Sequence, residues 1–350
     1  IGLVVLTALY TIFGGMKSVL YTSVLQTPIL LLGSLIILVL GFKELGGWDE
    51  MMRVCGAVTV NDYGDTMTNL IRSNDDANFP WLGALIGSAI IGFWYWCTDQ
   101  FIVQRVLSGK NEKEARRGTI FGAYLKLLPV FLFLIPGMIA FALHQKYIGA
   151  GGEGFLPMLA NGTANADAAF PTLVAKLLPA GVKGLVVCGI LAALMSSLAS
   201  LFNSSAMLFT IDFYKRFRPE TPEKKLVGIG QIATVVIVIL GILWIPIMRS
   251  VGDVLYTYLQ DVQSVLAPGI AAAFLLGICW KRTSAQGGMW GLIAGMIIGL
   301  TRLGAKVYYS NAGEVADSTF KYLFYDMNWL FFCGWMFLFC IIVVIVVSLA

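Results

Sequence analysis

Charged residues are scarce in this sequence, and their scarcity excludes most soluble proteins. Only 13% of the 350 residues are Asp, Glu, Lys or Arg, whereas 58% are hydrophobic and the mean hydropathy is +0.81. Soluble domains carry about 25% charged residues. There is also one histidine, His144, and no HExxH or paired-aspartate motif, while Asp99 and Asp261 are isolated in the sequence. These absences argue against a membrane enzyme, which needs a reactive cluster.

Cysteine is also sparse, and no secretory leader is visible in the sequence. The six cysteines are scattered, and most of them fall inside or beside apolar stretches, so no disulfide framework is predicted. No signal peptide is visible, and Ile1 already lies inside an apolar run. We therefore expect the fold to have an upstream portion that this chain does not include.

Long apolar runs dominate what is present. A helix needs roughly 20 mostly apolar residues to cross the hydrocarbon of a bilayer, and lipid leaves its backbone groups no other partner. We predict an all-α polytopic membrane protein with about nine transmembrane helices, the first incomplete. Their predicted ranges are 1–13, 18–41, 82–106, 119–143, 179–210, 226–248, 258–280, 287–308 and 325–348.

The basic residues predict the orientation of these helices. They are concentrated after the third, fifth and seventh stretches, in the segments 105–117, 215–225 and 281–282. Short loops rich in Lys and Arg stay in the cytoplasm. The longer loops at 43–81, 145–178 and 310–321 are then extracellular. The net charge of +4 thus follows from membrane topology and does not indicate nucleic-acid binding, and no obligate protein partner is indicated.

Polar groups inside the apolar stretches are candidates for function, because they are costly in a membrane. Lys126 lies about two turns into the fourth stretch. It either pairs with a carboxylate, reaches the interface, or points into a substrate cavity. Gln260 precedes Pro268-Gly269, and its amide either reads a substrate hydroxyl or caps a broken helix.

An aromatic cluster and a serine pair give two further candidates. Tyr95 and Trp96 lie in the run Phe93-Trp94-Tyr95-Trp96, which forms either a face for a sugar ring or an interfacial aromatic belt. Asp99 is expected to accept hydrogen bonds at helix ends. Ser196 and Ser197 follow Ala193 by three and four residues, so all three project toward one region of a helix. Two hydroxyls and a carbonyl suit a weakly held hard cation, whereas small residues also serve helix packing.

Three runs together resemble the sodium/solute symporter family, and within it the sodium/glucose cotransporter branch. They are Tyr10-Thr11-Ile12-Phe13-Gly14-Gly15 with Tyr21-Thr22-Ser23-Val24-Leu25-Gln26-Thr27; Trp94-Tyr95-Trp96-Cys97-Thr98-Asp99-Gln100 with Val103-Gln104-Arg105; and Met195-Ser196-Ser197-Leu198-Ala199-Ser200-Leu201-Phe202-Asn203-Ser204. The similarity extends over nearly the whole chain.

The resemblance implies the LeuT-type fold, in which two inverted five-helix repeats enclose substrate and ion near the bilayer midplane. On that template, residues 1–41 are the last two helices of the first repeat and 42–81 form an extracellular loop. Residues 82–280 are the second repeat, and 281–350 are two peripheral helices. The first broken helix would lie upstream.

The resemblance also implies roles for the candidates. Tyr95 resembles the inner-gate tyrosine, Trp96 an aromatic neighbour of the sugar, and Lys126 and Gln260 resemble ligands of its hydroxyls. The set Ala193, Ser196 and Ser197 resembles part of the family's sodium site, completed by the upstream helix. No cofactor is expected, and sodium is the coupling ion.

Four residues depart from the family pattern. Ser23 stands where many members have an aspartate near the sodium exit path, and Ala199 replaces the threonine of a second sodium site, which favours one sodium per sugar. Gly92 replaces a polar residue, which leaves the sugar identity open, and Gln231 replaces a usual arginine.

The expected function is therefore sodium-coupled symport of a glucose- or galactose-like hexose across the plasma membrane, by alternating access. Symport of myo-inositol, a sialic acid or another polar solute remains an alternative, as does a sugar sensor that does not transport.

Overall fold

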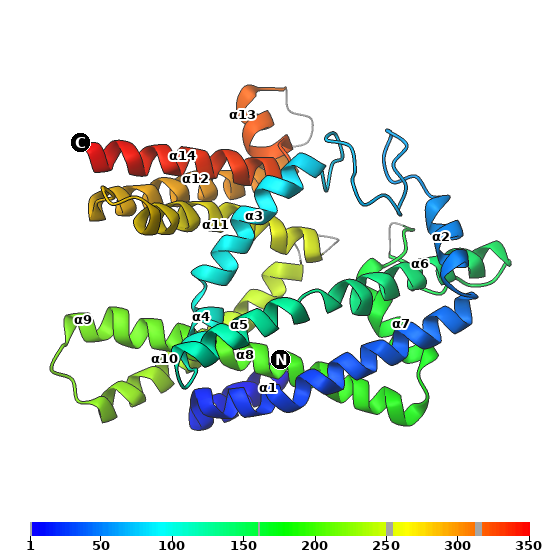
Figure 1. Ribbon diagram of the computed structural model, residues 1–350, viewed down its shortest axis with the longest axis horizontal. Helices are drawn as coiled ribbons and strands as arrows, with labels where there is room; N and C mark the ends of the chain where they lie inside the picture. The colour runs from blue at the N-terminus through cyan, green and yellow to red at the C-terminus, as the bar shows by residue number, and fades with distance from the viewer. Residues whose placement is uncertain (1, 160–161, 250–254, 312–316) are drawn as a thin grey trace. The chain divides into compact units, whose positions relative to one another are not determined.

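A computed structural model describes residues 2–159, 162–249, 255–311 and 317–350, and it is mostly helical (Figure 1). The chain divides into two compact units. Unit 1 contains residues 1–58 and 104–252, and unit 2 contains residues 59–103 and 253–350.

The elements of unit 1 are α1 (Gly2–Leu45), α2 (Trp48–Gly56), α5 (Glu112–Leu125), the π-helix η1 (Val130–Leu134), α6 (Ile135–Gly149), the 3-10 helix η2 (Ala166–Ala168), α7 (Ala169–Leu177), α8 (Ala180–Met207), the π-helix η3 (Leu208–Tyr214), α9 (Lys215–Phe217) and α10 (Glu223–Arg249). Those of unit 2 are α3 (Trp81–Cys97), α11 (Leu255–Cys279), α12 (Ala285–Asn311), α13 (Thr319–Lys321), the π-helix η4 (Tyr322–Asp326) and α14 (Trp329–Leu349). Helix α4 (Gln100–Leu107) contains the boundary between the units.

Within the described residues, seven helices are long and apolar enough to cross a membrane, or eight when the bent pair α3 and α4 counts as one span. The predicted stretches from 179 to the end correspond to α8 with η3, α10, α11, α12 and α14. The first two predicted stretches, 1–13 and 18–41, instead both lie in α1, apart from Ile1, which is outside the described residues. No proline separates them, so nothing in residues 14–17 forces the helix to end.

The third predicted span is broken near its aromatic cluster. Helix α3 ends at Cys97, and the chain bends by 47° before α4. The Thr98 hydroxyl donates to the Trp94 carbonyl at 2.7 Å, and the Asp99 carboxylate accepts from the Phe101 N–H at 3.1 Å. Asp99 therefore satisfies a helix N-terminus, as predicted.

The fourth predicted span is also interrupted. Helix α5 ends at Leu125, and the π-helix η1 begins at Val130, directly after Pro129. Proline has no N–H to donate to the carbonyl four residues earlier, which here belongs to Leu125. Lys126 is thus placed at the end of a helix rather than within a continuous one.

Glycines allow α1 and α8 to pack closely in unit 1. A Cβ atom on Gly33 would lie 2.5 Å from Val186 Cγ2, and one on Gly189 would lie 2.9 Å from Ile29 Cγ2. Small residues permit such close contact between helices in membranes. Gln231 of α10 also donates to the Ile12 carbonyl of α1 at 3.3 Å. This residue, which departs from the family pattern, therefore links α10 to α1.

Helices α3, α11, α12 and α14 pack together in unit 2. Figure 1 shows α11, α12 and α14 side by side. A Cβ atom on Gly87 of α3 would lie 2.9 Å from the Leu330 carbonyl oxygen of α14, and Gly295 of α12 faces Gly269 of α11. The core between these helices includes Val265, Ala272, Phe332, Met336 and Cys340.

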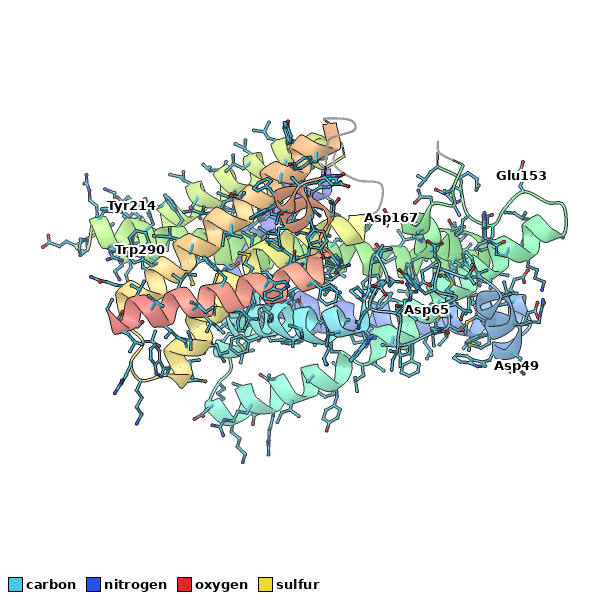
Figure 2. All side chains as sticks on the ribbon, turned by 90° about the horizontal axis from the view of Figure 1, so that it is seen from above. Asp49, Asp65, Glu153, Asp167, Tyr214 and Trp290 are labelled. Carbon is cyan, nitrogen blue, oxygen red and sulfur yellow. The ribbon has the colours of Figure 1, made fainter. Side chains whose placement is uncertain are left out.

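Several acidic side chains lie in the loops and short helices between the long helices, as Asp49, Asp65, Glu153 and Asp167 do in Figure 2. In the loop before α3, the buried Asp76 carboxylate accepts from the N–H groups of Asn78 at 2.9 Å and Phe79 at 2.8 Å. Burial alone would raise the pKa of Asp76. The two backbone hydrogen bonds, a further hydrogen bond from the Asn61 amide and the positive charge of Arg72 together hold that pKa below its usual range.

Replacement of Gly87 tests the α3–α14 contact. We expect Gly87→Ala to lower the free energy of unfolding by about 1–3 kcal/mol, because the new methyl group meets backbone atoms that cannot move aside. Gly92→Ala, on the same helix but with nothing within 4 Å of its Cβ position, serves as the control. Thermal unfolding in detergent measures both, and equal midpoints would contradict the packing described.

Replacement of Asp76 tests the loop network. Asp76→Ala leaves several donors without an acceptor and should cost about 1–3 kcal/mol at neutral pH, whereas Asp75→Ala at the exposed neighbouring position should cost little. Because the folded-state pKa of Asp76 lies below the ordinary value of 3.8, the stabilisation is complete above that value and disappears as the pH falls through the folded-state pKa. Unfolding midpoints of both variants across this pH range check the sign, and a difference that persists in strong acid would contradict it.

Candidate functional site

The predicted site residues belong to both units. Ala193, Ser196 and Ser197 lie on α8 of unit 1, and Lys126 follows α5 in the same unit. The other three candidates belong to unit 2, where Tyr95 and Trp96 end α3 and Gln260 lies in the first half of α11.

The Ser196 hydroxyl is directed toward a neighbouring helix. Ser200 and Ser204, on the following turns of α8, donate to the carbonyls of Ser196 and Ser200 at 3.0 and 2.9 Å, as serines in helices commonly do. Ser196 is buried, and its Oγ lies 2.5 Å from Ser23 Oγ on α1 instead. Two hydroxyl oxygens that are 173 positions apart in sequence thus meet inside the membrane-spanning part of unit 1.

Ser197 presents its hydroxyl differently. Its side chain is exposed, and within the described part of the chain it has no hydrogen-bond partner. Ala193, one turn earlier, is partly buried. Adjacent helical residues point about 100° apart, so Ser196 faces α1 while the Ser197 oxygen stays available to a ligand beside it.

The Ser23 and Ser196 side chains that meet here offer neutral hydroxyl oxygens, and the nearby Ser200 hydroxyl accepts from the Arg105 guanidinium. Among the described residues, no group of three or more His, Cys, Asp or Glu side chains could hold a metal ion. Hydroxyls and carbonyls suit a hard, weakly held cation, whereas transition metals prefer imidazole or thiolate ligands. The arrangement of Ser23, Ser196 and Ser197 therefore fits an alkali metal ion.

Lys126 lies at the helix break that precedes Pro129. Its side chain is exposed, and its N–H donates to the Gly122 carbonyl at 3.0 Å. Broken helices line substrate sites in transporters because they leave backbone polar groups available. The break therefore supports a role in binding without excluding the interfacial alternative.

Tyr95 and Trp96 form the end of α3. Their ring centroids are 5.6 Å apart with the planes at 89°, an edge-to-face pair, and Trp96 is 40% exposed. The neighbouring Trp94 packs instead into the core of Ile90, Ala271 and Cys333. The two candidates are thus at the bend between α3 and α4, while the aromatic residue before them is structural.

Gln260 has a neighbour whose role the sequence did not reveal. Its side chain is partly buried and, within the described residues, has no hydrogen-bond partner. The next residue, Asp261, forms ion pairs with Arg302 at 3.4 Å and Lys306 at 2.5 Å. Asp261 is isolated from other acidic residues in the sequence, and the fold brings two cations to it. Two cations four residues apart in the apolar stretch 287–308 were the signal that could have indicated a carboxylate partner.

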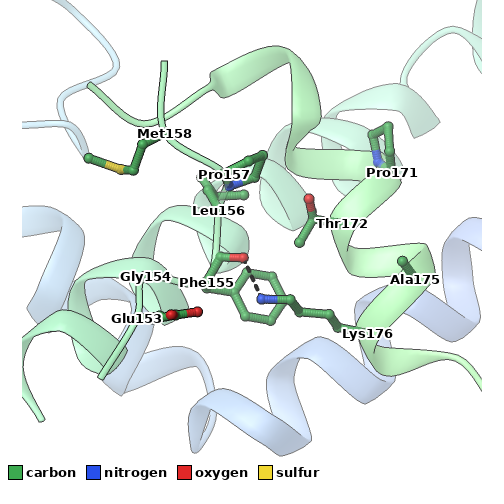
Figure 3. Close-up of a pocket in the computed structure, with 10 residues that line it drawn as sticks. All are labelled: Glu153, Gly154, Phe155, Leu156, Pro157, Met158, Pro171, Thr172, Ala175 and Lys176. Carbon is green, nitrogen blue, oxygen red and sulfur yellow. Dashed lines mark hydrogen bonds between the residues drawn. The ribbon is translucent and has the colours of Figure 1, made fainter. Parts of the chain in front are cut away.

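A separate pocket of about 760 Å³ lies in the loop region of unit 1 that connects α6 to α7 (Figure 3). Lys176 crosses it, with Nζ donating to the Phe155 carbonyl at 2.8 Å and lying 4.7 Å from the centroid of the Phe155 ring. None of the predicted site residues lines this pocket.

The chain is similar in sequence to known proteins over most of its length. The model of the sodium:solute symporter family matches residues 1–295. The sheep (Ovis aries) sodium/glucose cotransporter 1 is 38% identical, with 99% of this chain and 55% of the relative covered. The human (Homo sapiens) sodium/myo-inositol cotransporter 2 is also 38% identical, with 87% of this chain and 46% of the relative covered. The chain spans about half the length of the curated relatives it matches.

A solved structure has the same fold. The substrate-bound, outward-open state of a Na⁺-coupled sialic acid symporter matches with a TM-score of 0.74 and 23% sequence identity, covering 99% of this chain and 65% of that one. This likeness confirms the predicted all-helical membrane fold.

A carboxylate at position 23 tests the cation assignment. We expect Ser23→Asp to strengthen sodium binding about fivefold, because a negative charge is added beside the Ser196 hydroxyl. Ser23→Asn, similar in size but neutral, should not strengthen it. The measurement is the rise in unfolding temperature with sodium concentration in purified protein, with potassium as the ionic-strength control. Equal sodium responses in both variants would contradict a cation beside Ser23.

Proposed function

Because the chain belongs to the sodium:solute symporter family, we propose that the protein carries a polar solute across the membrane together with sodium. The observation that carries this proposal is the meeting of the Ser23 and Ser196 hydroxyls beside the available Ser197 oxygen. The family consists of sodium-coupled transporters, so the membrane-enzyme alternative is removed. The chain is part of a multi-pass membrane protein, and we place it in the plasma membrane, across which a sodium gradient drives nutrient uptake.

We propose a hexose of the glucose or galactose type as the solute. Relatives named for glucose and for myo-inositol are equally similar to this chain, and both solutes are neutral rings rich in hydroxyls. Trp96 is 40% exposed, and its indole offers an apolar surface to the apolar side of such a ring. Gln260 and Lys126 offer the amide and ammonium donors that hydroxyls need. Myo-inositol or a sialic acid is the alternative solute.

We base the proposed domain organisation on membership of the sodium:solute symporter family. Residues 82–280 form the second five-helix repeat, and the described helices in this range make five spans, namely α3 with α4, α5 to α6, α8 with η3, α10, and α11. Residues 1–41 complete the first repeat, 42–81 are extracellular, and 281–350 carry the peripheral helices α12 and α14.

In the proposed mechanism, sodium binds to the Ala193 carbonyl and to the hydroxyls of Ser196 and Ser197, and it stabilises an outward-open state. The solute then binds, with Tyr95 closing beneath it, and the repeats rock to release both toward the cytoplasm. Coupling requires that sodium bind the two states with different affinities. Ala199 is buried and has no hydroxyl, so we propose a single sodium per solute.

One sodium is sufficient for accumulation. Moving one charge through 100 mV is worth about 2.3 kcal/mol, and a tenfold sodium gradient adds about 1.4 kcal/mol. Their sum of about 3.7 kcal/mol supports a solute gradient of roughly 500-fold.

Uptake of radiolabelled hexose into proteoliposomes tests the proposal. The full-length protein should take up the sugar only when sodium is supplied. Ser197→Ala should raise the sodium concentration for half-maximal uptake about tenfold, because the bound sodium ion loses one of its oxygen ligands. Ser205→Ala, two turns further along α8, is the matched control. Sodium dependence that survives Ser197→Ala unchanged would contradict the ion site, and solute binding without flux would favour the sensor.

A further inference from the structure

An ionic cluster on α11 and α12 supplies none of the proposed ligands of the ion or the solute. Asp261 Oδ2 accepts from Lys306 Nζ at 2.5 Å, and its Oδ1 lies 3.4 Å from Arg302 Nη2. The Arg302 side chain is fully buried, and that of Asp261 is 13% exposed. Unpaired charges are costly inside a membrane protein, so each of these groups depends on the others.

Arg302 connects the cluster to the rest of unit 2. Its Nη2 also donates to the Met327 carbonyl at 2.9 Å, directly after η4. Its guanidinium carbon lies 4.1 Å from the centroid of the Phe332 ring on α14, a cation–π contact. Through Arg302, Asp261 is therefore fixed with respect to α12, η4 and α14.

The cluster stands at one end of a close contact between α11 and α12. On successive turns of α11, Gly269 faces Gly295, and Val265 lies 2.5 Å from where a Cβ of Gly299 would be. Asp261 is the next turn in this series, and it contacts Arg302 and Lys306 on α12. The glycine contacts set the distance between the helices, while the carboxylate sets how α11 is rotated about its own axis.

This rotation matters for Gln260, which immediately precedes Asp261. Its side chain points about 100° away from that of Asp261 around the helix, and it has no hydrogen-bond partner of its own among the described residues to hold it. We propose that Asp261, held by Arg302 and Lys306, is a positioning residue that aims the Gln260 amide at the transported solute. This inference rests on the proposed function.

The charges of the cluster predict unequal effects of replacing Asp261 and of replacing Lys306. The cluster has two cations and one carboxylate, so Asp261→Asn leaves two like charges together, and α11 loses this charged anchor to α12. Lys306→Gln leaves the neutral Arg302–Asp261 pair in place, and Lys306 is already 33% exposed. Loss of the carboxylate is therefore expected to be much more damaging than loss of the lysine.

The test is a double-mutant cycle on sodium-dependent hexose uptake by the full-length protein in proteoliposomes. Asp261→Asn should raise KM for the sugar about tenfold, with a smaller change in the maximal rate. In a Gln260→Ala background, the same substitution should raise KM less than twofold, because its effect passes through the missing amide. A merely structural role of Asp261 would multiply KM by the same factor in both backgrounds.

Three variants serve as controls. Asp317→Asn removes a carboxylate that is 94% exposed and pairs with Lys321, and it should leave KM unchanged. Lys306→Gln should change KM less than threefold. Asp261→Glu keeps the charge, should restore most of the affinity, and also reports on the site if Asp261→Asn fails to fold. The sodium-induced rise in unfolding temperature without sugar should be the same in all of them.

Three results would overturn the inference: an unchanged KM in Asp261→Asn, equal effects in both backgrounds, or a Gln260→Ala variant with normal KM. Absence of sodium-dependent uptake in the unmodified protein would instead refute the proposed function. The same cycle on sugar binding, followed by the shift of the unfolding temperature, would then decide the positioning role separately.

Discussion

A polar group in hydrocarbon must find its partner inside the protein, and the structure follows from this constraint. It makes the long segments helical, because only a helix satisfies its own backbone. It also turns the hydroxyls of Ser200, Ser204 and Thr210 back onto carbonyls of their own helix. Against this background, Ser196 is an exception in meeting a hydroxyl of another helix, whereas the Ser200 hydroxyl additionally accepts from the Arg105 guanidinium of α4. The cation site is inferred from that exception together with the family to which the chain belongs.

Charged groups in the long helices also need partners inside the protein. Arg302 is fully buried: its Nη2 contacts Asp261 and the Met327 carbonyl and its guanidinium carbon lies over the Phe332 ring, while its Nε and Nη1 have no hydrogen-bond partner among the described residues. Such a cluster adds little net stability when compared with apolar packing, but it fixes one arrangement of helices, since losing one partner leaves a buried charge. In the proposed rocking mechanism, a fixed geometry beside Gln260 is a functional property.

The sequence was sufficient for the helices but not for their interruptions and contacts. Hydropathy located α8, α10, α11, α12 and α14, because length and apolar character are local properties. It missed the bend at Thr98 and the π-helix after Pro129, which depend on how individual hydrogen bonds are redirected. Two stretches at the start were predicted as separate helices, although no residue between them ends α1.

Side-chain partners were the least predictable feature. The pairing of Ser23 with Ser196 joins segments 173 positions apart, and the pairing of Asp261 with Lys306 joins two different helices. The motif around Ser196 identified the candidate ligands, whereas only the fold revealed what they contact. The roles of Tyr95, Trp96, Lys126 and Gln260 remain predictions, supported by their places at helix breaks or beside the ionic cluster.

The central claim is that sodium and a sugar move together, one for one. Simultaneous measurement of radioactive sodium and radiolabelled hexose fluxes into proteoliposomes containing the full-length protein tests it most directly. The account predicts that each sugar molecule is accompanied by one sodium ion and that a sugar gradient alone drives sodium uphill. Sugar flux with no accompanying sodium flux would contradict it.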